Sequence, residues 1–260
     1  MRNKIKKKVR FFIGIIVICI IIGGIYVYMK ASSMITSIEN YNVAVEMYNT
    51  ESEKYNELLE NCCVDNISDM PSEMGLLKRE KESFIATINA VCKGNSKEKI
   101  EKDTKTIDSL IRIIKTNNQI VQQITSPKEE WVIHRLKNVS EIKSVEQVTE
   151  KNNPDGLLGK SGGYNSCVYF SIKNLDVKDV SGNTVVEKGV DGGGGIEIYS
   201  TLEDAEKRCN YLQGFDDTIL YSGSYAIVGT MVVRTSYLLS EEDQLYLTNK
   251  IVEAFTLLDD

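Results

Sequence analysis

Residues 11–29 have the sequence FFIGIIVICIIIGGIYVYM, an uncharged run of nineteen residues. At a rise of about 1.5 Å per residue, a helix of this length just crosses a hydrocarbon core about 30 Å thick. A cleaved signal peptide is the alternative, but its apolar part is typically about 7–15 residues long and ends at a small-residue cleavage site. Here the run is longer, and YVYMK at 26–30 separates its most apolar part from the small residues at 31–33. We therefore expect an uncleaved transmembrane helix over 11–29, with the lipid bilayer as its partner.

Positive charge gathers on the N-terminal side of this run. Residues 1–10 contain six Lys or Arg, Lys30 is the one cation just after the run, and residues 1–30 contain no Asp or Glu. The positive-inside rule then predicts a basic cytoplasmic tail over 1–10 and an extracytoplasmic remainder, as in a single-pass cell-membrane protein. Residues 31–260 carry a net charge of −13. Such an acidic exterior argues against a nucleic-acid partner, because phosphates require a basic surface.

Residues 32–126 have the periodicity of amphipathic helices, with apolar positions at steps of about three and four. The runs are Met34, Ile38, Tyr41, Val45, Tyr48, Tyr55, Leu59 and Cys62 (with Ser52 as a break); Met70, Met74, Leu77, Phe84, Ile88 and Val91; and Ile100, Ile107, Ile111, Ile114 and Val121, flanked by Leu110 and Ile124. Three such helices joined by short loops predict an antiparallel bundle. A parallel coiled-coil dimer of the first run is the alternative. In either arrangement the region is an all-α spacer outside the membrane.

Residues 127–260 have the signals of an α+β domain. A Ser126-Pro127 cap predicts a helix that buries Trp131, Val132, Leu136 and Val139, and a turn is expected over 152–156. Alternating residues predict a strand over 166–172, with Val168, Phe170 and Ile172 on one face. A short strand over 184–187 and another over 196–199, after a glycine loop at 192–195, are also expected.

In the last third of the domain, predicted helices and a predicted strand again follow one another. The sequence Thr201-Leu-Glu-Asp204 is a capping box before a helix, and Ser240 caps a final helix whose buried stripe is expected to hold Leu245, Ile251, Val252 and Phe255. Residues 224–235 predict one long strand, with Gly229 as a bulge or a point of close contact. Together these elements predict a mainly antiparallel sheet with helices on one face.

The same part of the chain contains a series of residues at characteristic spacings. They are Pro127, Glu130-Trp131-Val132-Ile133, Leu136, Val148-Thr149-Glu150, Pro154, Gly156, Gly159-Lys160, Gly162-Gly163-Tyr164, Val168-Tyr169-Phe170, Asp191-Gly-Gly-Gly194, Ile196-Glu197, Tyr199, Glu203-Asp204-Ala205, Arg208, Tyr211-Leu212, Phe215-Asp216, Ser222-Gly223-Ser224, Gly229-Thr230 and Arg234-Thr235-Ser236. In these residues the chain, over about 130 residues (127–258), resembles an uncharacterised C-terminal module of Gram-positive membrane-anchored surface proteins and lipoproteins. The resemblance implies an extracytoplasmic bacterial module, and it implies no catalytic residues.

Two loops are the first candidates for a binding surface, because loops on a rigid scaffold often carry recognition. Their residues are Asp155, Gly156, Lys160 and Tyr164 in the first loop, and Asp191 and Gly193 in the second. We expect no catalytic residue, no metal site and no cofactor. The single histidine, His134, is expected to be a surface residue, and Glu197 is expected on the outer face of its strand.

Cys167 and Cys209 form a possible disulfide. Cys167 lies on the strand face opposite Val168 and Phe170, and Cys209 lies on the inward face of the following helix. A bridge forms if the helix covers the Cys167 face, whereas the opposite packing leaves two buried thiols.

These features predict a membrane-tethered extracytoplasmic protein that binds or scaffolds a protein or another component of the cell envelope. A cell-envelope enzyme of the hydrolase type, with the α+β domain as its catalytic part, is the alternative, and a purely structural stalk is a third. The ligand and the oligomeric state do not follow from the residues. A nucleophile, a base and an orienting group are not clustered along the chain, which favours binding over catalysis.

Overall fold

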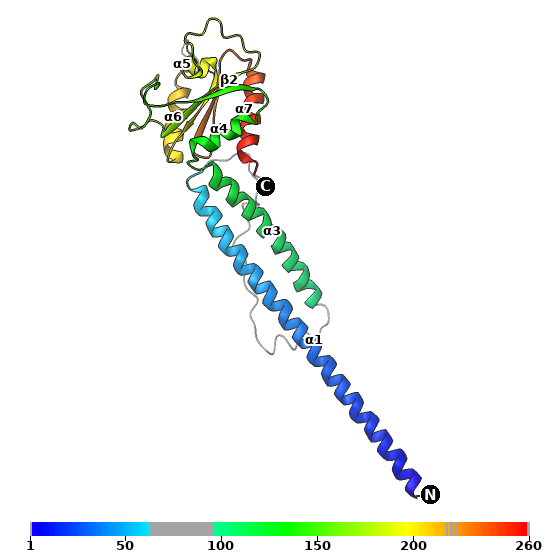
Figure 1. The fold of residues 1–260 in the computed structure, drawn as a ribbon. Coiled ribbons are helices and arrows are strands. Elements are labelled where there is room, and N and C mark those ends of the chain that lie inside the picture. Colours follow the sequence, from blue (N-terminus) through cyan, green and yellow to red (C-terminus); the bar gives the residue numbers. More distant parts are fainter. Residues whose placement is uncertain (1, 63–95, 217, 219–220, 222, 259–260) are drawn as a thin grey trace. The chain divides into compact units, whose positions relative to one another are not determined.

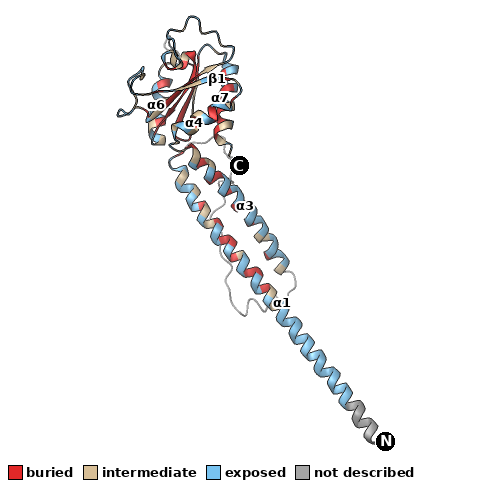
Figure 2. Cartoon of the chain, in the orientation of Figure 1, coloured by how far each residue is buried: buried red, intermediate tan, exposed pale blue. Residues whose placement is uncertain are grey.

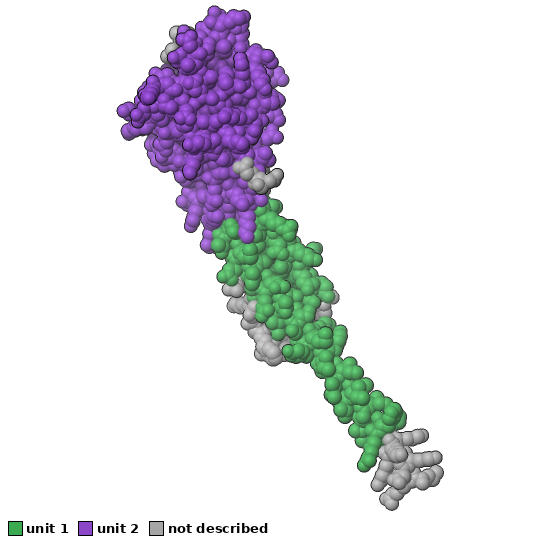
Figure 3. Space-filling model, in the orientation of Figure 1, with its two compact units in different colours: residues 1–52, 73–113 green, residues 53–72, 114–260 purple. Residues whose placement is uncertain are grey.

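The computed structural model describes residues 2–62, 96–216, 218, 221 and 223–258, without the side chains of 2–9 and 96. The chain divides into two compact units (Figure 3). The first comprises Met1–Ser52 and Glu73–Ile113, and the second comprises Glu53–Ser72 and Ile114–Asp260. The contacts thus group residues 114–126, which the sequence pattern assigns to the spacer, with the α+β domain.

The first unit begins with the helix α1 (Arg2–Leu59), which continues without a break through the apolar run at 11–29. The large apolar side chains of that run are exposed (Figure 2), from 41% at Ile15 to 75% at Tyr28. By length and composition this part of α1 is able to cross a membrane. The predicted long apolar N-terminal helix is therefore confirmed.

Most of the predicted apolar positions of the first run are buried or half-buried, but Leu59 is 37% exposed. Met34 and Ile38 form a small cluster with Ile100 of the helix α3 (Ser96–Ile124). Ser37 donates a hydrogen bond to Glu101 across the same pair of helices at 3.1 Å. The predicted run over 70–91 lies outside the described residues.

Figure 1 shows the second unit as a sheet with helices packed beside it. The sheet has five antiparallel strands in the order β1-β2-β3-β5-β4. Its strands are β1 (Ile142–Gln147), β2 (Ser166–Ile172), β3 (Gly193–Ile198), β4 (Tyr225–Val228) and β5 (Met231–Thr235). The predicted mainly antiparallel sheet and the strand over 166–172 are confirmed. The edge strand β1 was not predicted, because its sequence IKSVEQ alternates only weakly.

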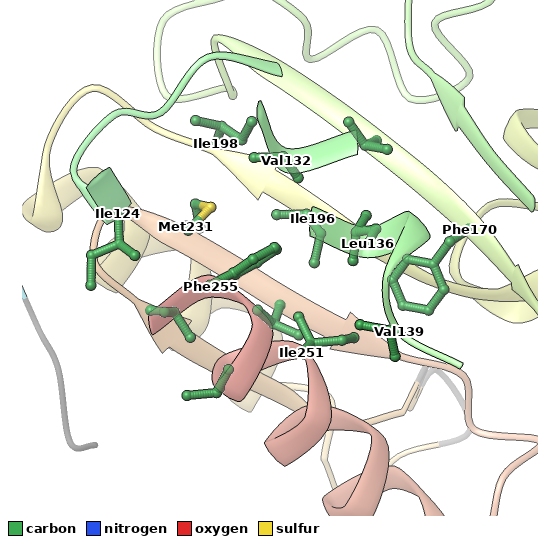
Figure 4. Close-up of a cluster of buried hydrophobic side chains, with 14 of the residues drawn as sticks. Ile124, Val132, Leu136, Val139, Phe170, Ile196, Ile198, Met231, Ile251 and Phe255 are labelled. Carbon is green, nitrogen blue, oxygen red and sulfur yellow. The ribbon is translucent and has the colours of Figure 1, made fainter. Parts of the chain in front are cut away.

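Helices cover both faces of this sheet, so the expectation of helices on one face was wrong. One core contains Val168 and Phe170 of β2, and it is covered by α4 (Glu129–Lys137) and α7 (Glu241–Thr256) (Figure 4). The opposite core contains Cys167 and Tyr169. It is covered by α5 (Val185–Lys188), the 3-10 helix η1 (Gly189–Gly192) and α6 (Leu202–Gln213).

The glycine run at 192–195 is mostly strand, not the expected loop. Gly194 lies opposite Phe170 and Gly195 lies opposite Tyr169 in the β2–β3 ladder. A Cβ atom on Gly194 would lie 2.3 Å from the Phe170 ring, and one on Gly195 would lie 2.8 Å from the Tyr169 ring. The two rings occupy the space that side chains would fill, one on each face, so the glycines pair as a strand and are buried.

Two other predicted strands were also wrong. Residues 185–188 form α5, because Thr184 and Glu187 make a reciprocal capping box at its start. Residues 224–235 form the β4–β5 hairpin, whose turn contains Gly229 at φ +62°. A left-handed residue at this point reverses the chain, so Gly229 lies in a turn and not in a bulge. The alternative prediction of a close contact at Gly229 is confirmed, since a Cβ atom there would lie 2.0 Å from the Ile124 carbonyl oxygen.

The helix α4 begins later than the Ser126-Pro127 cap predicts. Ser126 has φ +44°, and its backbone N–H donates to the Thr230 hydroxyl at 2.7 Å. The N–H of Thr230 in turn donates to the carbonyl of Ile124 at 3.2 Å. Because the β4–β5 turn holds this segment, Ser126 cannot cap the helix, and Lys128 occupies the N-cap position without a side-chain bond. The predicted caps at Thr201 and Ser240 are present.

Candidate functional site

A buried carboxylate lies near the centre of the sheet. Glu197 is on β3, between Ile196 and Ile198, which face the α4–α7 core. Since side chains alternate along a strand, Glu197 points to the opposite face, beneath α6. Its side chain is 1% exposed. The expectation of an outward-facing Glu197 was wrong, because both faces of this sheet are covered.

Two arginines and a tyrosine surround Glu197. Arg208 of α6 donates from Nε to Oε2 at 2.7 Å and from Nη2 to Oε1 at 2.8 Å, which is a bidentate pair. Arg234 of β5 donates from Nη1 to Oε1 at 3.1 Å, and the Tyr199 hydroxyl donates to Oε2 at 3.0 Å. Both carboxylate oxygens are therefore satisfied by side chains from α6, from β5 and from the residue that follows β3.

Glu197 stays ionised in this setting. Burial alone would raise its pKa, but the hydrogen bond and charge of Arg208, together with Arg234 and Tyr199, hold the pKa below its usual value. For Tyr199, burial and the neighbouring carboxylate raise the pKa. The cluster thus contains one fixed negative charge and two positive charges, without a group that exchanges protons near neutral pH.

The arginines also line an open surface cleft of about 460 Å³. Its lining residues are Asp155, Leu157, Arg208, Tyr211, Leu212, Phe215 and Arg234. The guanidinium of Arg208 lies over the Tyr211 ring, with 5.5 Å from Cζ to the ring centroid. The rings of Tyr211 and Phe215 meet edge to face at 5.1 Å between centroids. The cleft is therefore lined by both charged and aromatic side chains.

One of the two predicted binding loops reaches this cleft. Asp155 lines it, and the hydroxyl of the buried Tyr164 donates to Asp155 Oδ1 at 2.6 Å. Burial and this hydrogen bond raise the pKa of Tyr164, so the hydroxyl remains a donor. Gly156, at φ +71°, and Lys160 are exposed in the same loop and do not line the cleft.

The second predicted loop does not form part of the cleft. Asp191 lies in η1, half-buried, where burial raises its pKa and the charge of Arg234 lowers it. Gly193 is a buried residue of β3 and not a loop residue. The backbone in this region is occupied by structural bonds, such as that from the Ser236 hydroxyl to the Asp191 carbonyl at 2.9 Å.

Cys167 and Cys209 belong to the same core, under α6, as the disulfide hypothesis requires. Cys167 is a thiol in the structure, and its burial raises its pKa well above the usual value. The bridge between Cys167 and Cys209 stays a prediction. Mass spectrometry of the non-reduced protein is its test. His134 is exposed on α4, outside the cleft.

The central residues Glu197, Arg208 and Arg234 were not chosen from the sequence. All three occur among the residues that carry the resemblance described above, but no local pattern links positions so far apart in the chain. A usable signal was the charged residue at 197 between Ile196 and Ile198 in an otherwise apolar strand. A strand that is buried on both faces forces such a residue to find a partner.

A second cleft, of about 450 Å³, lies between α7 and the ends of β1 and β2. The Tyr246 hydroxyl donates to Glu141 there at 2.9 Å, and both side chains are exposed to solvent on the rim. The Arg208 cleft is the stronger candidate, because its charged groups are buried and held in place.

Comparison with models of known protein families, with curated protein sequences and with solved structures found no match for this chain. The resemblance to Gram-positive surface modules therefore stays a prediction.

Proposed function

We propose that this chain is a membrane-tethered extracytoplasmic binding or scaffolding protein of the bacterial cell surface. The exposed apolar run at 11–29 of α1 is the observation that supports attachment to a membrane. These nineteen consecutive uncharged residues are exposed in the described structure. In water, their exposure costs about 25 cal/mol of free energy per Å² of apolar surface. A bilayer removes that cost.

The orientation follows from charge. Six cations precede the run and one follows it, which favours a cytoplasmic N-terminus and an extracytoplasmic C-terminal unit. The acidic remainder of the chain is compatible with this placement, since an anionic inner leaflet attracts basic segments and not acidic ones.

The helical region then acts as a spacer within one chain. The buried positions Met34 and Ile38 of α1 pack against Ile100 of the same chain. This packing favours a bundle over a parallel dimer, because a dimer would use the same α1 face for a second copy.

The Arg208 cleft supports binding over catalysis. Glu197 is fully engaged with two arginines and a tyrosine, and its pKa is lowered, so it is unsuited to donate a proton. Arg208 and the rings of Tyr211 and Phe215 are groups that recognise ligands without chemical reaction.

Topology is tested with a membrane-impermeant protease on protoplasts. We expect degradation of residues 31–260, with protection of a short N-terminal fragment. The same treatment after lysis, and a cytoplasmic marker protein in the intact cells, are the controls. Protection of the C-terminal unit in intact cells, followed by its degradation after lysis, would refute the proposed orientation.

Binding is tested with the full-length chain purified in detergent micelles and incubated with peptidoglycan, teichoic acid and membrane fractions. We expect retention by one of these fractions, weakened by Tyr211→Ala, and no turnover. Chemical turnover of a fraction that is abolished by a single Asp, Glu, Ser or Cys substitution would replace the binding function with a hydrolase.

A further inference from the structure

Arg208 is held rigidly with one side of its guanidinium still unused. Nε and Nη2 bond to Glu197, at 2.7 Å and 2.8 Å, and the group lies over the Tyr211 ring. Within the part of the chain that the structure describes, Nη1 makes no hydrogen bond. A guanidinium fixed in this way loses little side-chain entropy when a ligand binds to its remaining N–H groups.

Charge around the cleft is balanced. Arg208 and Arg234 contribute two positive charges, buried Glu197 contributes one negative charge, and Asp155 at the cleft contributes another. Because these four charges of the described residues cancel, the cleft favours a monoanion over a dianion, since a second negative charge on the ligand would be repelled by both carboxylates.

Asp155 supplies an acceptor on the same cleft. Its Oδ1 accepts from the Tyr164 hydroxyl at 2.6 Å and from the Leu157 N–H at 3.1 Å, which fixes the orientation of the carboxylate. Among the described residues, Oδ2 accepts no hydrogen bond. A ligand N–H group, from an amide or an amine, is the complement of that oxygen.

From this arrangement we infer that the cleft binds the carboxylate of a small ligand or of a peptide C-terminus, with Arg208 as its receptor and Tyr211 and Phe215 as the surface for an adjoining apolar group. The planar carboxylate matches the end of the guanidinium, where Nη1 and Nη2 each present an N–H. This inference rests on the proposed binding function and specifies the ligand class of the same cleft.

The probes are four small molecules that share one aromatic ring: N-acetylphenylalanine, N-acetylphenylalaninamide, free phenylalanine and phenyl phosphate. Binding to the full-length chain in detergent micelles is measured by calorimetry or ligand-observed NMR. We expect the N-acetylated acid to bind at least tenfold more tightly than its amide, which lacks the charge, and more tightly than the dianionic phosphate. Tighter binding of free phenylalanine than of the N-acetylated acid assigns a free amino acid as the ligand, and the reverse order assigns a chain terminus.

Three variants test the assignment of residues. Arg208→Lys keeps a positive charge near Glu197 but loses the bidentate end, and we expect at least a tenfold loss of affinity for the acid with little effect on the amide. Tyr211→Ala, at a side chain that is 60% exposed, is expected to weaken both by about threefold without unfolding the protein. Lys207→Ala, at the neighbouring exposed position of α6, is the control and should bind as the wild type does.

Equal binding of the acid and the amide would overturn the inference. So would unchanged affinity in both Arg208→Lys and Tyr211→Ala, with thermal unfolding confirming that each variant is folded. If no probe binds but the envelope fractions still retain the chain, the ligand class is wrong and the proposed binding function stands. If the chain binds no probe and no envelope fraction retains it, both the ligand class and the proposed binding function fail.

Discussion

At the residue scale, the pair Glu197–Arg208 differs from an ordinary surface ion pair because it is largely buried. Glu203 and Lys207 of the same helix form a pair at 2.8 Å with side chains that are 76% and 62% exposed. The side chains of Glu197 and Arg208 are 1% and 14% exposed. The two pairs thus offer a matched comparison, since the cation of each lies on α6.

Glu197→Ala should destabilise the protein by about 3–5 kcal/mol, because it leaves two arginines without their buried counter-ion. Glu203→Ala should leave the unfolding midpoint unchanged, since its pair is screened by solvent. Urea unfolding of both variants measures the difference. A loss of similar size in the two variants would contradict the role of burial.

The same carboxylate makes stability depend on pH. Because the pKa of Glu197 is lower in the folded state than in the unfolded chain, its pairs stabilise the fold above an unfolded pKa of about 4.3. This contribution is lost as pH falls through the lower folded-state value. Glu197→Gln should therefore show a weaker loss of stability between about pH 5 and pH 2 than the wild type does. Parallel acid dependence of the two proteins would show that other carboxylates dominate.

At the element scale, the β4–β5 turn is held by close backbone contact. A Cβ atom on Gly229 would lie 2.0 Å from the carbonyl oxygen of Ile124, and φ is +62°. Gly159 has a similar φ of +68° but open space around it. Substitution of Gly159 therefore tests backbone strain alone, whereas substitution of Gly229 tests backbone strain together with steric overlap.

Gly159→Ala should cost about 1–2 kcal/mol, the usual penalty for a left-handed alanine. Gly229→Ala should cost roughly 3 kcal/mol or more, because the turn or the end of α3 also has to move. Thermal unfolding of both variants is the measurement. Equal losses would mean that the contact between the turn and Ile124 adjusts freely.

The final helix, α7, buries a different leucine from the one that its sequence spacing predicts. Leu245 was expected in the buried stripe of α7, but it is 63% exposed, whereas Leu247 is 2% exposed and packs in the α4–α7 core. Ile251, Val252 and Phe255 are buried as expected. The apolar side chains of α7 do not all belong to its core face, and Leu245 is left on the outer one.

Leu247→Ala should therefore destabilise the protein by about 2–5 kcal/mol through lost burial and a cavity. Leu245→Ala should change stability by no more than about 0.5 kcal/mol. Chemical unfolding of the two variants compares the same substitution two positions apart. The reverse ranking would mean that α7 is rotated about its axis.

At the scale of the whole molecule, the sheet unit includes more chain than its sequence boundary suggests. Val121 and Ile124 of α3 are fully buried in the core that α4 and α7 cover. The sequence boundary predicts that a fragment of residues 126–260 folds alone with one cooperative transition. The packing of α3 predicts that this fragment lacks part of its core.

A fragment of residues 114–260 should thus unfold at a temperature on the order of 10 °C higher than 126–260, from the burial of two more apolar side chains. Differential scanning calorimetry of both fragments is the measurement, with each checked for a single transition. Equal midpoints would place the end of α3 outside the cooperative unit.

What the residues determined by themselves is local or periodic. The apolar run at 11–29, the helical spacing around Met34 and Ile100, and the caps at Thr201 and Ser240 depend on neighbours within a few positions. Hydrogen bonds and side-chain contacts over such short separations are set by composition and spacing alone. The strand over 166–172 followed from its alternation in the same way.

The tertiary structure decided the features that depend on distant partners. The glycines of β3 form a strand because the rings of Tyr169 and Phe170 fill their faces, and Ser126 fails to cap a helix because Thr230 binds its N–H. Glu197 is buried, with Arg208 and Arg234, because α6 covers the second face of the sheet. Each of these contacts joins residues from different elements, and its free energy exists only once those elements have packed together.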